Sequence, residues 1–383
     1  MSPIIQIIAS FLIGSALVYF TIPVIVRLSI AKKLVDVPNE RKVNKTPIPN
    51  LGGVALFLGI TIATLLSIHK NPFPDFRYLQ AGMIILFFIG VKDDILIISP
   101  RKKFIAQLIS AFIIIIPGGI RFTNLHGLFG FYEIDYGFSF ALTTLAIVAI
   151  INALNLIDGI DGLASAIGIL ASMLFGILFY FSGHINYTIV SFAITGSLIS
   201  FFFFNVFGRK NKIFMGDTGS LLLGLLLSVF AIKYNEFSLS MSNEARSFAP
   251  VLSLAILAIP IFDMIRLFAE RILKNKSPFA PDINHIHHKI LKLGFNHLNS
   301  TLILISANLI LIAFVFAFRS LNNHILLFML ILLGTFFSFI PRFFYEYRKA
   351  ENSTTKKLQF SLFFMPFKKF QEKENDSTEL LKD

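Results

Sequence analysis

The sequence predicts an all-α integral membrane protein, a polytopic helical bundle with about 11 transmembrane helices. Of its 383 residues, 55% are hydrophobic and only 15% are charged, whereas a soluble domain has roughly 25% charged residues. The mean hydropathy is +0.75. A hydrocarbon layer about 30 Å thick requires about 20 apolar residues per helix, and such runs recur along the chain between short polar loops.

Eleven apolar runs are the expected membrane helices. They cover approximately residues 4–25, 51–68, 78–96, 103–118, 138–156, 163–182, 187–206, 218–233, 249–270, 300–318 and 324–341. The first run is too long for a cleaved signal and is soon followed by further runs, so we expect it to remain as a helix.

The placement of basic residues predicts the orientation, because Lys and Arg in short loops mark the cytoplasmic side. With eleven spans, 28 of the 34 Lys and Arg residues fall on one side and 6 on the other. We therefore expect the N-terminus outside and the C-terminus in the cytoplasm. The same placement accounts for the net charge of +12, so no nucleic-acid partner is expected.

Two regions are expected, a membrane domain over residues 1–341 and a basic, partly disordered cytoplasmic tail over 342–383, which is rich in Lys, Glu and Ser. The chain has no Cys, which excludes disulfides and thiolate metal sites. On the expected outer side, FTNLHGLFGFYEIDYG alternates apolar and polar residues around Gly and favours a hairpin.

Nearly every Asp, Asn and His with the spacing of a site falls in the five expected cytoplasmic loops. Asp93 and Asp94 follow the apolar run MIILFFIGV. Two adjacent carboxylates repel each other, which favours a divalent cation or a proton-transfer role. An ordinary charged helix end explains the pair equally well.

The segment NALNLIDGIDGLA contains two pairs of polar residues with a spacing of three, Asn152 with Asn155 and Asp158 with Asp161. A helix would put each pair on one face, but Gly159 and Gly162 indicate that the helix ends here and that the backbone is open to a ligand. Ionisable groups near membrane depth are costly and usually functional. A simple polar turn is the alternative.

IFMGDTGS places Asp217 between two glycines, ahead of another apolar run. Such a turn lets backbone N–H groups face an anion while the carboxylate holds Mg²⁺, although the same residues also suit a helix N-cap. Phe214 is either an interface side chain or a surface on which a base stacks.

HIHH supplies His285, His287 and His288, whereas the other five His residues are scattered. A Zn or Fe site needs more ligands than this, so the cluster favours phosphate binding or proton transfer. Lys45 and Lys103 lie in basic loops. Beside carboxylates, such residues could pair with phosphate oxygens.

Carboxylates, basic residues and the lack of a hydroxyl or thiol nucleophile motif together fit phosphoryl transfer. A site level with the lipid headgroups indicates a lipid substrate. Two other functions remain open. A cation-coupled transporter would show broken helices near the midplane and a repeat, and a His-ligated membrane oxygenase would need more than one His cluster.

Five motifs in order resemble the polyprenyl-phosphate N-acetylhexosamine-1-phosphate transferase family. They span about residues 34–295 and read DVPNERKVNKTPIPNLGG, GVKDD followed by SPRKKFIAQ, NALNLIDGIDGLA, IFMGDTGS and SPFAPDINHIHHKI. The resemblance implies transfer of a HexNAc-1-phosphate, most often GlcNAc-1-phosphate, from a UDP-sugar to undecaprenyl phosphate, giving undecaprenyl-diphosphate-HexNAc and UMP. It also implies Mg²⁺, with Mn²⁺ as the alternative ion, a multi-pass location in the bacterial inner membrane, and leaves a homodimer open.

Residue roles come from the same resemblance. Asp217 and Asp93 are the implied Mg²⁺ ligands, and an Asp of the pair either deprotonates the lipid phosphate or acts as a covalent nucleophile. The implied catalytic residues are Asp93, Asp94, Asp217, His285, His287 and His288. The implied substrate-binding residues are Lys45, Lys103, Asn152, Asn155, Asp158, Asp161 and Phe214.

The HIHH form resembles the branch that primes O-antigen, common-antigen and teichoic acid synthesis. The peptidoglycan branch, the phospho-MurNAc-pentapeptide transferases, usually has a PxHHHFE-type stretch, which this chain lacks. Asn44 stands where the first branch commonly has His. Because Asn exchanges hydrogen bonds but carries no charge, no acid–base role is expected there.

Overall fold

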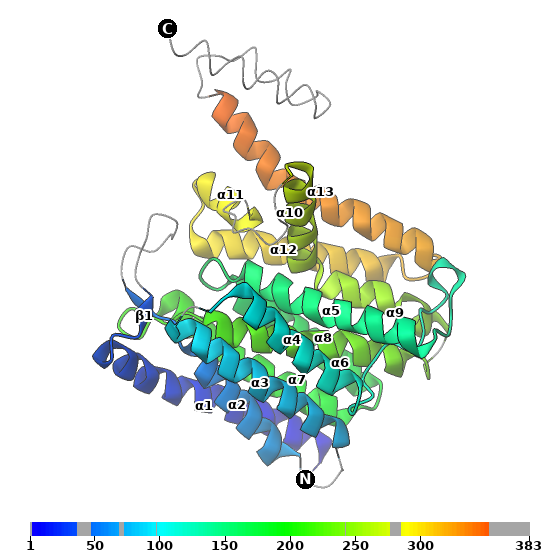
Figure 1. The fold of residues 1–383 in the computed structure, drawn as a ribbon. Helices are drawn as coiled ribbons and strands as arrows, with labels where there is room; N and C mark the ends of the chain where they lie inside the picture. The colour runs from blue at the N-terminus through cyan, green and yellow to red at the C-terminus, as the bar shows by residue number, and fades with distance from the viewer. Residues whose placement is uncertain are drawn as a thin grey trace.

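The computed structural model describes residues 2–36, 47–68, 73–96, 98–241, 243–275 and 285–351. These residues form a helical bundle, as predicted (Figure 1). Its elements are α1 (Pro3–Ala31), β1 (Val35–Asp36), β2 (Ile48–Pro49), α2 (Gly52–Ser67), α3 (Pro74–Leu96), α4 (Pro100–Ile115), η1 (Leu128–Gly130), α5 (Tyr136–Ile157), α6 (Leu163–Phe181), α7 (Ile185–Phe202), η2 (Phe203–Phe207), α8 (Gly216–Ser238), α9 (Asn243–Ile256), α10 (Ala258–Leu273), α11 (Ile286–Lys292), α12 (His297–Ala317) and α13 (Asn323–Glu351).

Each of the eleven predicted runs falls on a helix or a helix pair. Within the described residues, seven helices are long and apolar enough to cross a membrane, or up to eight if the bent pair α9–α10 is one span. Helices α2 and α4 have 16 residues each, about 24 Å at 1.5 Å per residue. The polytopic α-helical class is therefore confirmed, whereas the count of eleven and the sides of the termini stay predictions.

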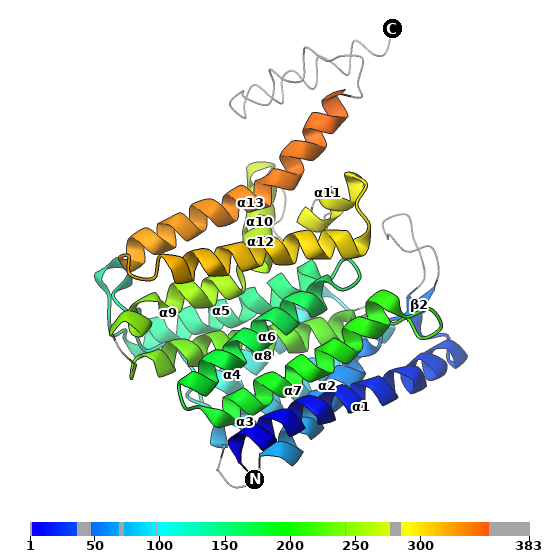
Figure 2. The ribbon, with the colours of Figure 1, turned by 180° about the vertical axis from the view of Figure 1, so that it is seen from behind.

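Helix α8 lies at the centre of the bundle, because its sequence is apolar on all sides. Nearly all of its residues are buried, including the run Leu221–Leu227, and α2, α3, α5, α6 and α9 pack around it. Helix α1 runs along α7 and α2 at the edge (Figure 2). The ends of α8 consequently meet the ends of several other helices, which sets the position of the site.

The predicted run over residues 249–270 is not one continuous helix, because the chain bends by 79° between α9 and α10. Asn308 on α12 stabilises the break: its Nδ2 donates to Ile256 O at 3.0 Å, and its Oδ1 accepts from Ile259 N at 3.1 Å. A buried helix break persists when a side chain satisfies the freed backbone groups. As a result, α10 stands almost upright beside α11 in Figure 1.

The two ends of the bundle differ. At one end Val35–Asp36 pairs with Ile48–Pro49 in a short antiparallel ladder. At the other, Asn124 and Glu133 form an antiparallel bridge, in agreement with the predicted hairpin. The predicted tail overlaps α13, which continues to Glu351, and residues 352–383 lie outside the described residues. The boundary at 341 therefore stays a prediction.

Candidate active site

Four helix ends meet around one lysine. Lys103, in the first turn of α4, places its Nζ 2.9 Å from Asp93 Oδ2 at the end of α3 and 2.8 Å from Asp217 Oδ2 at the start of α8. Asn155, near the end of α5, donates from Nδ2 to Asp217 Oδ1 and to Ser220 Oγ, the latter at 2.9 Å. The structure thus gathers four residues that the sequence predicts for the site.

Asp94 has a different environment from its neighbour Asp93. Its Oδ1 accepts from Asp217 N at 2.8 Å, and its Oδ2 accepts from Thr218 N at 3.1 Å and from Thr218 Oγ1 at 2.6 Å. The first N–H groups of a helix lack partners within the helix, and a carboxylate there also interacts favourably with the helix dipole. Asp94 therefore caps α8 from the neighbouring helix α3.

Asp158 follows the last residue of α5 and is partly buried. It makes no hydrogen bond or ion pair with any residue that the structure describes. Burial, together with the nearby carboxylates of Asp217, Asp94 and Asp161, raises the pKa of Asp158 to about 8. Such a cluster of like charges favours a bound cation.

The segment after α5 is a turn, as Gly159 and Gly162 predict, so Asp158 and Asp161 do not share a helix face. Gly162, at φ +84°, begins the reversal into α6. Asp161 accepts from Lys212 Nζ at 2.6 Å and lies 3.1 Å from His297 Nδ1. Burial raises the pKa of Asp161, but these two partners outweigh it and lower the pKa below its usual value.

Asn152 connects two helices rather than facing the carboxylates. Its Nδ2 donates to Gln107 Oε1 on α4 at 2.7 Å and to Val148 O at 2.7 Å. The substrate-binding role predicted for Asn152 is not visible in these contacts, which hold α4 and α5 together beside the site.

The His cluster approaches the turn after α5. A Cβ on Gly159 would lie 2.2 Å from Nε2 of His287, so only glycine allows this approach. His287 is fully buried, and neither ring nitrogen has a hydrogen-bond partner among the described residues. Burial, and then the neighbouring His288 and His285, lower the pKa of His287 well below its usual value, which favours a neutral ring.

The segment before α8 is held by the PNLGG motif. Phe214 N donates to Pro49 O at 2.8 Å, and Gly52 N donates to Phe214 O at 3.0 Å. Asn50 Nδ2 donates to Asp94 O at 3.0 Å. These bonds fix the backbone of Phe214 beside the site, while Lys45 and Asn44 lie outside the described residues.

Several residues at the site were missed from the sequence. His297 and Lys212 hold Asp161, and Thr218 pairs with Asp94. Asp263 on α10 contacts His285. The sequence does contain a signal for Asp263, because Asp263, Arg266 and Glu270 are charged residues at helical spacing inside an otherwise apolar run.

The donor set suits a metal ion that is shared with a substrate. Among the described residues, no three His, Asp or Glu side chains are grouped closely enough to hold an ion by themselves. Mg²⁺ is commonly held by one or two carboxylates together with substrate phosphates and water. Asp217 and Asp93, which both contact Lys103, together with the unpaired Asp158, fit that mode of binding.

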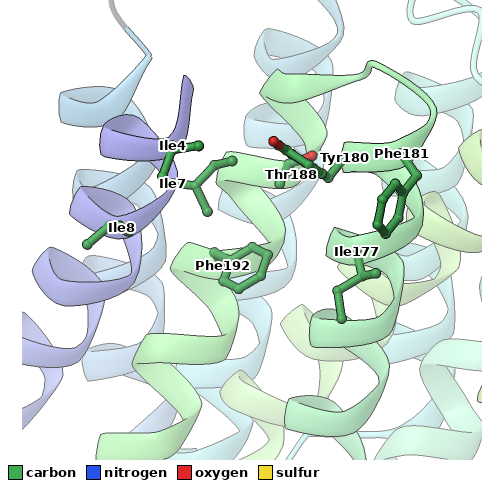
Figure 3. A pocket seen from close by; sticks show the side chains of 8 residues that line it. All are labelled: Ile4, Ile7, Ile8, Ile177, Tyr180, Phe181, Thr188 and Phe192. Atoms are coloured by element: carbon green, nitrogen blue, oxygen red, sulfur yellow. The ribbon is translucent and has the colours of Figure 1, made fainter. Parts of the chain in front are cut away.

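An apolar groove of about 300 Å³ lies between α1, α6 and α7 (Figure 3). Its lining comes from the first turns of α1 and α7 and the last turns of α6: Ile4, Ile7, Ile8, Ile177, Tyr180, Phe181, Thr188 and Phe192. Because α6 starts beside the carboxylates and ends at this groove, the groove is at the opposite end of the bundle. It does not belong to the site.

Comparison with known proteins identifies the family of the chain. Residues 76–235, which contain Lys103 and the five carboxylates Asp93, Asp94, Asp158, Asp161 and Asp217, match glycosyl transferase family 4. Two relatives are undecaprenyl-phosphate alpha-N-acetylglucosaminyl 1-phosphate transferases: one from Salmonella typhi, 30% identical over 76% of this chain and 77% of the relative, and one from Yersinia pestis, 33% identical over the same shares. A probable undecaprenyl-phosphate N-acetylglucosaminyl 1-phosphate transferase of Bacillus subtilis is 30% identical over 83% of this chain and 85% of the relative. The chain therefore belongs to glycosyl transferase family 4, and the resemblance seen in its five motifs is confirmed.

Proposed function

We propose that the protein transfers GlcNAc-1-phosphate from UDP-GlcNAc to undecaprenyl phosphate, giving undecaprenyl-diphosphate-GlcNAc and UMP. The relatives' names support the enzyme class, the acceptor and the transferred group. The observation that carries the proposal is the cluster in which Lys103 joins Asp93 and Asp217 beside the unpaired Asp158. It combines cation-binding carboxylates with a phosphate-binding ammonium, as phosphoryl transfer requires.

Mg²⁺, or Mn²⁺ in its place, would be held by Asp217 together with Asp93 or Asp158, and when bound it neutralises charge on the donor diphosphate. Asn155 orients the Asp217 carboxylate through its side-chain amide. Lys103 contacts both Asp93 and Asp217, so its ammonium is available to phosphate oxygens at the same place.

Asp93 is the better candidate of the pair for taking a proton from the lipid phosphate. Both oxygens of Asp94 are held by hydrogen bonds from the start of α8, whereas Asp93 has one oxygen on Ile98 N and shares the Lys103 ammonium with Asp217 through the other. In this scheme the lipid phosphate oxygen attacks the phosphorus bonded to the sugar, and UMP leaves. Phe214, fixed through its backbone, is proposed to stack on the uracil.

The protein would act in the bacterial inner membrane, with the site at the cytoplasmic face, and would prime a cell-surface polysaccharide. The apolar helices support a multi-pass membrane protein, and the relatives come from bacteria. Donor and acceptor differ in solubility, so a site at helix ends is accessible to both. A homodimer remains a prediction.

The test is a donor panel with the purified full-length protein, undecaprenyl phosphate and Mg²⁺. Radiolabelled UDP-GlcNAc is expected to give a labelled lipid and an equal amount of UMP, with UDP-GalNAc and UDP-MurNAc-pentapeptide giving less. A labelled lipid formed only from UDP-MurNAc-pentapeptide would assign the protein to the peptidoglycan branch. If no UDP-HexNAc yields a lipid product, the proposal is refuted.

A transporter is the second candidate because α9 and α10 form a broken helix, as transporters often do. In transporters the break itself supplies the ion site. Here both freed backbone groups are bound by Asn308, and the unpaired Asp158 lies at the end of α5 instead. The broken helix therefore serves to turn α10, and phosphoryl transfer is favoured.

A further inference from the structure

The His cluster is attached to α10 through one buried carboxylate. Asp263 places Oδ2 3.1 Å from His285 Nδ1, and its Oδ1 accepts from Ile286 N at 3.1 Å. The side chains of Asp263 and His285 are 3% and 7% exposed. Both oxygens of Asp263 therefore hold the first residues of α11, from a helix that reaches this place only because the chain bends after α9.

Asp263 is itself fixed by an ion-pair network that continues to α13. Arg266 donates from Nη2 to Asp263 Oδ1 and from Nη1 to Glu270 Oε1, both at 2.7 Å. Arg342 on α13 donates to the same Glu270 oxygen at 3.0 Å. Because buried ion pairs depend on close geometry, the network leaves the Asp263 carboxylate little freedom to turn.

The contact determines which nitrogen of His285 faces the site. An ionised carboxylate only accepts hydrogen bonds, so Nδ1 of His285 must carry the hydrogen of this pair. Nε2 of His285 has no partner among the described residues. A carboxylate bound to one ring nitrogen commonly fixes the tautomer and the orientation of a catalytic imidazole, which leaves the other nitrogen for the substrate.

We infer that Asp263 is a positioning residue for the transfer reaction, which holds His285 with Nε2 directed to the substrate phosphates or sugar. The inference rests on the proposed function, since it assigns a supporting role within that same site. Asp263 does not touch the substrate in this scheme. It acts through His285, and the Arg266–Glu270–Arg342 network holds Asp263 in turn.

A purely structural role for Asp263 would be to cap α11 and to neutralise Arg266. Such a role predicts losses in stability that do not depend on whether His285 is present. A positioning role predicts that the loss in turnover from changing Asp263 disappears once His285 is gone. A double-mutant cycle on turnover separates the two, because coupling is measured only between groups that act together.

The experiment compares wild type, Asp263→Asn, His285→Ala and the double variant, with kcat and KM for UDP-GlcNAc measured in detergent. Asp263→Asn is expected to lower kcat roughly 10- to 100-fold, the usual loss when a supporting carboxylate is removed, with KM little changed. The double variant should be no slower than His285→Ala. If the two losses in kcat multiply in the double variant, or if Asp263→Asn keeps the wild-type kcat, the inference is overturned.

Two further variants keep the test decisive if Asp263→Asn does not fold. His285→Asn places an amide nitrogen near the position of Nδ1, so it keeps the bond to Asp263 but loses Nε2. His285→Gln places its amide nitrogen near Nε2. We expect His285→Gln to retain more turnover than His285→Asn, and the reverse order contradicts the inference.

The matched control is Asp135→Asn, because Asp135 also accepts from a backbone N–H at a helix start, Phe138 N at 3.1 Å. Asp135 lies at the start of α5, whereas the site lies at the end of this helix. Asp135→Asn should therefore leave kcat unchanged. Failure of the proposed function is recognised separately, since wild type would then form no lipid product. In that case the same four proteins, compared by thermal unfolding, still show whether Asp263 and His285 are coupled.

Discussion

The two ends of α8 both hold partly buried ion pairs, but only at one end does every carboxylate have a partner within the described residues. At its last turns, Lys233 Nζ lies 2.8 Å from Asp75 Oδ2, and the same oxygen accepts from Tyr187 OH at 2.7 Å. Glu236 accepts from both the backbone N–H and the hydroxyl of Thr123. Every charged group here has a partner within the protein.

At its first turn, α8 meets an excess of negative charge. Lys103 is the one ammonium that contacts Asp93 and Asp217 among the described residues, and Asp158 has no partner there. Keeping uncompensated charge in a fold is costly, and such costs typically persist at functional sites. The difference indicates that the end with Lys233, where every carboxylate is paired, stabilises the bundle, whereas the other end is completed by a cation and a substrate.

The largest effect on turnover is expected for Asp217→Asn, which removes a proposed Mg²⁺ ligand while keeping the size of the side chain. Turnover should fall by roughly a thousandfold or more, as when stabilisation of transition-state charge is lost. Lipid product formation measures it, and thermal unfolding checks the fold. Near-normal turnover would contradict the assignment of Asp217.

Lys103→Met should lower turnover by roughly a hundredfold, because an ammonium that pairs with phosphate oxygens is lost. The variant also leaves Asp93 and Asp217 without their shared partner, so the Mg²⁺ concentration for half-maximal activity should change. A titration with Mg²⁺ measures both quantities. An unchanged Mg²⁺ dependence would mean that Lys103 acts apart from the carboxylates.

Asp94→Asn should lower turnover roughly tenfold, the smaller loss expected of a residue that supports a ligand. Asn can accept fewer of the hydrogen bonds from Asp217 N and Thr218, so the start of α8 should loosen. Thr218→Val tests the same contact from the other side. If Asp94→Asn is as inactive as Asp217→Asn, Asp94 acts directly and is more than a cap.

The smallest effect on turnover is expected at the Lys233 end of α8. Asp75→Asn should leave kcat within a factor of about three, since distant sites act nearly independently. It should lower the free energy of unfolding by about 1–3 kcal/mol, the worth of a charged hydrogen bond. A large loss of turnover without a loss of stability would abolish the distinction between the two ends.

The helices and the polar residues of the site could be predicted from the sequence, because apolar runs and motif spacing are local signals. The hydrogen-bond and ion-pair partners of these polar residues could not be predicted. Nothing in the spacing of Asp93 and Asp94 shows that one meets Lys103 and the other caps α8, since this depends on how α3 packs on α8. The break at residue 257 was missed because its stabilising residue, Asn308, comes far later in the chain.

Lipid product and UMP measured against Mg²⁺ concentration test the central claim most directly, with Asp217→Asn and Asp75→Asn beside wild type. We predict that wild type and Asp75→Asn convert UDP-GlcNAc only with the ion, lose activity on chelation and regain it when Mg²⁺ is restored, while Asp217→Asn stays inactive throughout. Equal activity of wild type with and without divalent ions would contradict the account.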